Sequence, residues 1–180
     1  MLLLGWALGR WLDLHPLETL HLSPGAIILG VAATAPLLLG LRWTLNTPRQ
    51  SLRQLVQLVQ DQLGPMLASR SPGDLALLAL LAGSAEELLF RGVIQAGLTL
   101  WVPDVIAVVV ASGLFGLAHF VTPSYAILAG IAGAYLGAIY LLEGNLLVPI
   151  VAHALYDFVA LTWLVRRYRT AKAAEPAAEI

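Results

Sequence analysis

The sequence predicts an all-α fold, a polytopic bundle of transmembrane helices, and two observations support this prediction. Of the 180 residues, 59% are hydrophobic and only 12% are charged, and the mean hydropathy of +0.81 is too high for an ordinary soluble domain. The apolar residues also fall into stretches of about 20 residues, the length that crosses a bilayer as a helix. We expect about five spans and one amphipathic helix at the membrane interface.

Charge and cysteine content narrow the classes of partner and chemistry. The formal net charge is −1, which argues against a nucleic acid partner because phosphate binding requires a basic surface. The chain has no cysteine, which excludes a disulfide framework, a thiolate metal site and a cysteine nucleophile. Membrane lipid is the expected surrounding partner.

The N-terminal region, 1–74, combines three predicted elements. Residues 1–14 are apolar but short, and we expect an interfacial or poorly inserted helix there. The first span is predicted over 26–41, with Trp43 as an interfacial anchor. Residues 48–63 place apolar side chains on one helical face and polar ones on the other, which fits either a membrane-surface helix or a soluble connector helix.

The region 75–165 is predicted to form a four-helix core. Prolines and helix-capping residues divide it, and a stripe of Gly130, Gly133 and Gly137 suits close helix contact. The four predicted spans are 75–100, 105–121, 125–142 and 147–164.

Basic residues predict how the chain is oriented. They lie between the first and second spans and after the last span, whereas the links near Pro103 and Glu143 carry none. They are Arg42, Arg49, Arg53, Arg70, Arg166, Arg167, Arg169 and Lys172. The positive-inside rule makes both regions cytoplasmic. We therefore expect a multi-pass protein of the plasma (inner) membrane, ending in a tail, 166–180, that is basic and then disordered.

Three charged side chains interrupt the second span. A charge at bilayer depth is costly unless it faces a partner or a wet cavity, so Glu86, Glu87 and Arg91 suggest a functional site. Glu87 and Arg91 are four residues apart, with the acid first, which is the favourable order for an ion pair on a helix. Glu86 is rotated by about 100° from Glu87 and has no such local partner. An unpaired carboxylate near an arginine suits a site that handles protons.

Two later spans carry the remaining intramembrane ionisable groups apart from the tyrosines: His119, His153 and Asp157. His153 and Asp157 share a helical face, so the carboxylate can hold the imidazole. Phe115 and His119 share a face in the same way. Each cluster alone has a structural alternative, since a lone histidine often joins two helices and a buried ion pair can be structural. Packing alone would not need so many costly groups.

The three clusters form ordered motifs on separate predicted spans. They read Glu86-Glu87-x-x-x-Arg91, Phe115-x-x-x-His119 and His153-x-x-x-Asp157, and Gly92 continues the first. Together they resemble the motifs of the CAAX-protease and bacteriocin-processing family of intramembrane proteases. The resemblance covers about half of the chain.

The resemblance implies hydrolysis of a peptide bond within the membrane, in a membrane-associated peptide or a lipidated, for instance prenylated CAAX-type, protein. Glu86 would be the general base that activates a water together with His119. His153 and residue 157 would position or stabilise the oxyanion. Many members look to have asparagine at 157, whereas ionised Asp157 can only accept hydrogen bonds, so a histidine-orienting or ligand role fits it better.

The resemblance also implies that Glu87 and Arg91 orient Glu86. It leaves open whether a metal takes part. Glu86, His119 and His153 could form a His₂Glu site for catalytic zinc, or glutamate and histidine could activate water without a metal.

The depth of these residues is a difficulty. Counted at about 1.5 Å per residue, Glu86 lies near mid-membrane, His119 near the cytoplasmic end of its span and His153 near the opposite side. Straight, untilted helices would not bring them together. We therefore expect a third span broken at Gly113 and Gly116, strongly tilted helices, or span limits displaced by several residues.

Two other functions use the same residue types. Buried Glu, His and Asp also serve as relays in proton- or ion-coupled carriers, although no pair of inverted halves is visible. A non-catalytic membrane scaffold could keep the polar cluster for packing or for holding a partner helix.

Overall fold

The structure is a computed structural model that describes residues 2–174, and no strand occurs within that range. The all-α prediction is confirmed. The helices are α1 (Leu2–Trp11), η1 (Pro16–Thr19), α2 (Pro24–Asn46), α3 (Gln50–Leu67), α4 (Pro72–Glu87), η2 (Leu88–Gln95), α5 (Ala96–Leu98), α6 (Asp104–Ala118), α7 (Pro123–Glu143) and α8 (Leu147–Ala174).

Three helices in the described range, α2, α7 and α8, are each long and apolar enough to cross a membrane. The predicted second span corresponds to α4, η2 and α5, which follow one another without a break from 72 to 98. Within this helix, η2 has the wider turns of a π-helix, a feature often found at functional sites. The 15 residues of α6 rise only about 22 Å, less than a bilayer core. This helix ends at Ala118, earlier than the predicted limit at 121.

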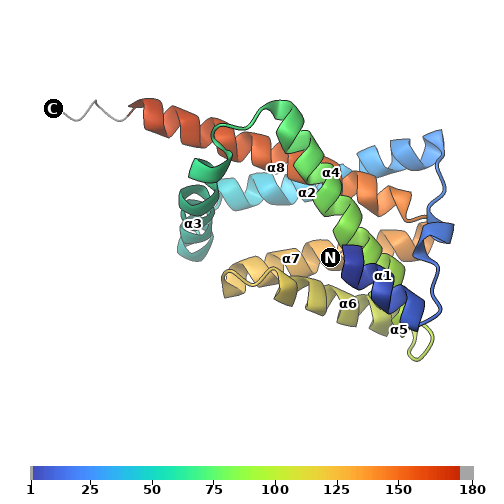
Figure 1. Cartoon of the computed structure of the whole chain (residues 1–180). Coiled ribbons are helices and arrows are strands. Elements are labelled where there is room, and N and C mark those ends of the chain that lie inside the picture. The colour runs from blue at the N-terminus through green and yellow to red at the C-terminus, as the bar shows by residue number, and fades with distance from the viewer. Residues whose placement is uncertain (1, 175–180) are drawn as a thin grey trace.

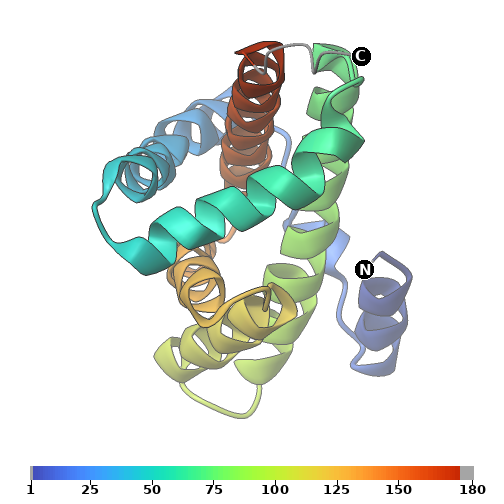
Figure 2. The ribbon, with the colours of Figure 1, turned by 90° about the vertical axis from the view of Figure 1, so that its left-hand side faces the viewer.

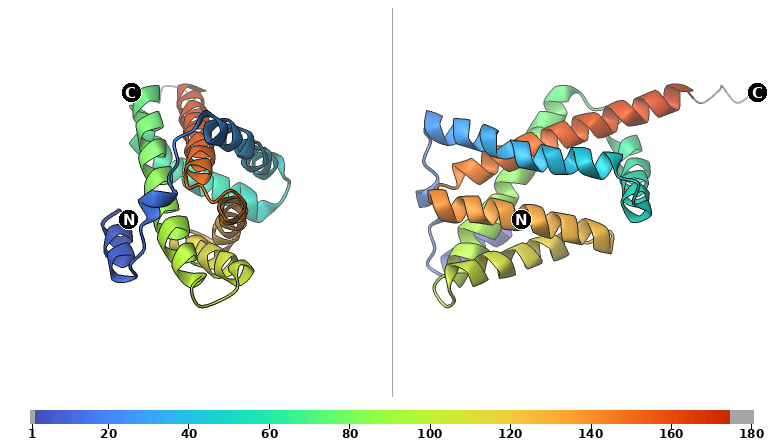
Figure 3. Two further views of the ribbon diagram at one scale, coloured as in Figure 1. Left: turned by 90° about the vertical axis from the view of Figure 1, so that its right-hand side faces the viewer. Right: turned by 180° about the vertical axis from the view of Figure 1, so that it is seen from behind.

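The helix that runs from α4 to α5 crosses the others steeply. Helices α2, α6, α7 and α8 lie roughly along a common direction, as the front and rear views show (Figures 1 and 3). Helix α4 packs mainly against α8, and α6 packs mainly against α7. The crossing helix therefore passes α8 at its α4 end and α6 at its η2 end, so its side chains can reach residues of both.

The amphipathic segment forms α3, which lies across one end of the bundle (Figure 2). It buries Leu52 and Leu55 and contacts α2, α7 and α8. Its position is compatible with both predicted roles, the membrane-surface helix and the connector. At the other end of the molecule, α1 is helical as predicted and packs beside η2.

Helix α8 continues beyond the predicted end of the span at 164, through the basic segment to Ala174. Arg169 holds this extension against the chain before α4, because its Nη2 donates to the backbone oxygens of Ala68 and Arg70 at 2.7 and 3.1 Å. Both basic regions therefore meet at one end of the bundle, as the predicted orientation requires. Disorder is predicted after Lys172, but Ala173 and Ala174 still belong to α8. The remaining residues, 175–180, lie outside the described residues.

The small-residue stripe brings α6 and α7 into close contact. A Cβ atom at Gly116 would lie 2.5 Å from the Ala126 backbone oxygen and 3.2 Å from Gly130 Cα, whereas a Cβ at Gly113 would meet nothing within 4 Å. We expect Gly116→Ala to lower the unfolding free energy by about 1–3 kcal/mol, because backbone atoms would have to move apart.

The matched control is Gly113→Ala on the same helix, which should raise the unfolding free energy by about 0.5–1 kcal/mol through helix propensity. Unfolding of both variants in detergent, followed by circular dichroism, measures the difference. Equal effects of the two substitutions would contradict the close contact.

Candidate active site

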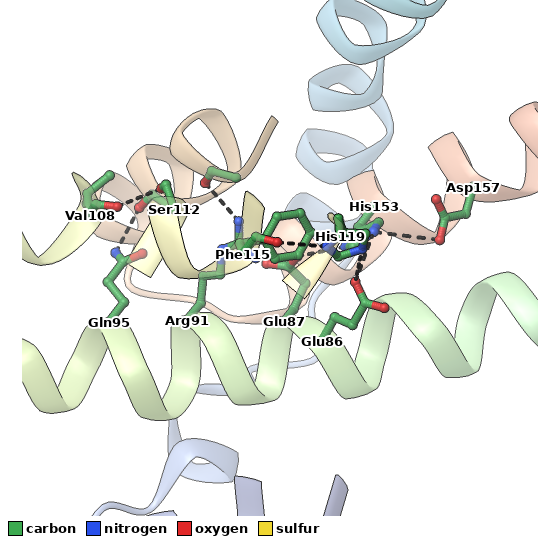
Figure 4. A network of polar contacts seen from close by, with 12 residues as sticks. Glu86, Glu87, Arg91, Gln95, Val108, Ser112, Phe115, His119, His153 and Asp157 are labelled. Atoms are coloured by element: carbon green, nitrogen blue, oxygen red, sulfur yellow. Dashed lines mark hydrogen bonds and ion pairs between the residues drawn. The ribbon is translucent and has the colours of Figure 1, made fainter. Parts of the chain in front are cut away.

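The structure brings all the predicted site residues together (Figure 4). They come from the end of α4, from η2, from the residue after α6 and from α8: Glu86, Glu87, Arg91, His119, His153 and Asp157. The steep crossing of α4 resolves the predicted difference in depth, since a tilted helix can meet the end of α6 and the first half of α8 at one place. Of the three explanations expected from sequence, the structure supports strong tilt and a displaced limit, since α6 ends at Ala118, but not a break, since α6 runs unbroken through Gly113 and Gly116.

The deepest part of the site is an ion pair. Glu87 and Arg91 are 0% and 1% exposed, and Arg91 Nη1 lies 2.9 Å from Glu87 Oε1. Arg91 Nη2 donates to the backbone oxygen of Gly133 at 2.8 Å, and its guanidinium lies 4.7 Å from the centre of the Phe115 ring. The pair predicted from the four-residue spacing is present, and α7 gives it a further acceptor.

The ion pair holds His153 rather than Glu86. His153 Nδ1 lies 2.7 Å from Glu87 Oε1, whereas its Nε2 lies 3.6 Å from Asp157 Oδ2, which is too long for a hydrogen bond. Two contacts differ from those expected. The imidazole of His153 makes its hydrogen bond to Glu87 on α4, while Asp157 on its own helix stays at ion-pair distance. Within the site, the Glu87–Arg91 pair contacts His153, and Glu86 Oε2 has no hydrogen-bond partner among the described residues.

His119 is held by its own helix. Its Nδ1 lies 2.8 Å from the Phe115 backbone oxygen, and its ring packs on the Phe115 ring with 4.3 Å between centroids. A carbonyl oxygen can only accept, so Nδ1 must carry the proton. In the neutral ring the Nε2 lone pair then faces outward, and Nε2 lies 3.3 Å from Glu86 Oε2.

The same reasoning applies to His153. Its Nδ1 donates to the Glu87 carboxylate, which leaves its Nε2 with a lone pair in the neutral ring, 3.9 Å from Glu86 Oε2. Glu86 Oε2 makes no hydrogen bond within the described residues. The lone pairs of Glu86, His119 and His153 therefore face one another, and such acceptors attract only when a proton or a hydrogen-bond donor lies between them.

The proposed zinc ligands do not fit a metal as they stand. No group of three or more His, Asp or Glu side chains in residues 2–174 is arranged to hold a metal ion. Ligand atoms about 2.0–2.1 Å from a tetrahedral zinc are about 3.3 Å apart. Glu86 Oε2 and His119 Nε2 have this spacing, at 3.3 Å, whereas Glu86 Oε2 and His153 Nε2 are 3.9 Å apart. We derive no step through a metal, and both the metal-dependent and the metal-free reaction remain predictions.

Sequence reasoning missed Gln95, which extends the buried polar row. The side chain is 2% exposed, and its Nε2 donates to the Gly137 backbone oxygen at 2.9 Å, one helical turn beyond the bond from Arg91 to Gly133. The signal was a glutamine four residues after Arg91 in an apolar run. These two bonds fix η2 against α7 beside the site.

A comparison with known protein families finds a match over the part of the chain that carries the site. The family model described as Type II CAAX prenyl endopeptidase Rce1-like matches residues 69–159. The chain belongs to this family. The matched range contains all the predicted site residues of this family member, from Glu86 to Asp157. Together with the apolar helices, family membership identifies an integral membrane protein.

A curated relative extends the comparison. The chain is 37% identical over 97 residues to "Uncharacterized protein YpbD" of Bacillus subtilis (strain 168). The match covers 52% of this chain and 47% of YpbD, so the chain spans about half the length of that relative. No solved structure matches the chain.

Proposed function

We propose that this protein is an intramembrane endopeptidase that hydrolyses a peptide bond in a membrane-associated peptide or lipidated protein, for instance a prenylated CAAX-type tail. One observation carries the proposal: Glu86 faces the Nε2 atoms of His119 and His153, 3.3 and 3.9 Å away, while other partners occupy both Nδ1 atoms. Acceptors that converge in this way suit the capture of a proton from water.

In this reaction a water binds beside Glu86 Oε2 and His119 Nε2, which are 3.3 Å apart, within hydrogen-bond reach of both. The water oxygen attacks the substrate carbonyl carbon as its proton passes to the Glu86–His119 pair, and the same pair then gives the proton to the leaving amine. The Glu86 and His119 side chains are 17% and 21% exposed, so solvent touches the edge of the site, although Glu86 Oε2 itself is buried. The Glu87–Arg91 pair behind them is fully buried.

The Glu87–Arg91 pair has a positioning role in this proposal. Glu87 accepts from Nδ1 of His153 and so keeps Nε2 of that ring turned toward the reacting groups. Arg91 cancels the charge of Glu87 where water cannot. We also place the end that carries Arg42, Arg70 and Arg169 on the cytoplasmic side of the plasma (inner) membrane.

The test uses the full chain purified and reconstituted in lipid vesicles. Two reporter peptides are offered, one ending in a prenylated CAAX sequence and one with the same residues on an unlipidated apolar anchor, and mass spectrometry maps the cut. Cleavage of either reporter at a single bond supports an endopeptidase, and the preference between them gives the substrate class. Cleavage of neither would contradict the proposal.

The need for a metal is tested separately. If glutamate and histidine activate water without a metal, dialysis against a chelator should leave kcat within about twofold of its initial value. Elemental analysis of the dialysed sample supplies the control. Loss of activity that zinc restores, with one zinc bound per chain, would instead support the His₂Glu alternative at Glu86, His119 and His153.

A further inference from the structure

The atoms that converge on the reaction centre are acceptors. His119 and His153 use their Nδ1 protons on Phe115 and Glu87, and ionised Asp157 has no proton to give. The guanidinium of Arg91 is already bonded to Glu87 and Gly133. A tetrahedral intermediate nevertheless carries a negative oxygen, which a protease stabilises with hydrogen-bond donors. The proposed reaction therefore needs a donor from outside the predicted motifs.

Tyr125 occupies the right place for this donor. It lies in the first turn of α7, which Thr122 caps by accepting from the Tyr125 backbone N–H at 3.2 Å. Its ring stands edge-on to the ring of His119, with 6.2 Å between centroids. The phenol is also near enough to the carboxylates of Asp157 and Glu86 to interact with both electrostatically.

The Tyr125 hydroxyl is available to a substrate. Its side chain is half-buried, and within the described residues no hydrogen bond engages the hydroxyl. The hydroxyl of Tyr135, on the same helix, is by contrast bonded to the Ala33 backbone oxygen at 2.9 Å. Tyr156 also neighbours Asp157 and Tyr125, but it has no such interaction with Glu86.

We propose that Tyr125 is a further catalytic residue, whose phenol O–H donates a hydrogen bond to the oxyanion of the tetrahedral intermediate. This inference rests on the proposed endopeptidase function. It assigns to Tyr125 the donation that an asparagine at 157 could make and Asp157 cannot.

The step balances without consuming the phenol proton. The water oxygen forms a bond to the carbonyl carbon, the C=O π pair moves onto the carbonyl oxygen, and the phenol O–H donates to that oxygen. When the intermediate collapses, the C–N bond breaks, its electron pair stays on nitrogen, and the Glu86–His119 pair protonates that nitrogen. Tyr125 keeps its own proton throughout.

The experiment compares Tyr125→Phe with Tyr135→Phe in the reconstituted full chain, using whichever of the two reporters the wild type cleaves. Both variants lose a phenol O–H and keep the ring. Tyr125→Phe should lower kcat by about 10²-fold or more, as loss of an oxyanion donor does, with KM within about twofold. Tyr135→Phe should keep the wild-type kcat.

A second variant separates catalysis from structure. Adding Asp157→Asn to Tyr125→Phe introduces an amide donor beside the site, and it should restore at least about tenfold of the lost kcat. Rates are scaled to the folded fraction measured by size-exclusion chromatography. A merely structural role of the phenol would not be rescued in this way.

The outcomes distinguish this inference from the proposed function. If wild type cleaves, Glu86→Gln does not, and Tyr125→Phe keeps full kcat, this inference fails while the proposed endopeptidase function stands. If Tyr125→Phe loses kcat but Asp157→Asn restores none, the role of hydrogen-bond donor is likewise overturned. If wild type cleaves neither reporter, both proposals fail together.

Discussion

Glu86→Gln should reduce kcat by about 10³-fold or more while the protein stays folded, because the amide keeps the shape of the side chain but cannot take a proton from water. The fold should tolerate the change, because Glu86 is only half-buried and the buried hydrogen bonds to Arg91 and His153 are made by Glu87. Cleavage of the reporter that wild type cuts, measured in vesicles alongside the melting temperature, tests both parts of this expectation.

The matched control is Glu143→Gln, which makes the same chemical change at an exposed position at the end of α7. It should leave kcat unchanged. Full activity of Glu86→Gln would remove Glu86 as the base. A folded, inactive protein would argue against the scaffold alternative, whereas an unfolded one would favour a structural role for the carboxylate.

Breaking the Glu87–Arg91 pair should lower the unfolding free energy more than any other proposed substitution. Arg91→Met would leave the Glu87 carboxylate 0% exposed without its cation, and breaking a buried pair on one side costs about 3–5 kcal/mol. The double variant Glu87→Gln with Arg91→Met removes both charges and should recover part of that loss. Unfolding by denaturant in detergent micelles measures all three proteins.

An exposed arginine supplies the comparison for this series. Arg42→Met, near the end of α2, should change the unfolding free energy by less than about 0.5 kcal/mol. If Arg91→Met were equally mild, the pair would not be as dry as its contacts indicate. If the double variant were less stable than Arg91→Met, the hydrogen bond from His153 to the Glu87 carboxylate would stabilise the fold by more than the unpaired buried charge of Glu87 destabilises it.

Fold class and site membership followed from local features of the chain. Hydropathy reports which stretches can enter lipid, and the cost of buried charge selects Glu86, Glu87 and Arg91 without knowledge of the fold. The motifs then added His119 and His153. These inferences need only composition and residue spacing along one helix, so they do not depend on how the helices cross.

Partners across helices could not be predicted in the same way. Four-residue spacing favoured Asp157 as the partner of His153, but the crossing of α4 over α8 brings Glu87 to 2.7 Å instead. Gln95 was missed because its acceptor, Gly137, is a backbone oxygen on another helix. The length of helix α8 could not be predicted either, because hydropathy detects only the apolar stretch, whereas helical hydrogen bonds continue beyond it to Ala174.

The oblique course of α4 links the reaction to the lipid itself. Glu86 and Glu87 lie on the inclined helix, while the imidazoles come from α8 and from the end of α6, which run with the bundle. Helices adjust their inclination to the local thickness of the hydrocarbon layer. A thicker or thinner membrane that changed the inclination of α4 would change the gap between Glu86 and both rings, so acyl-chain length would act as a control on turnover.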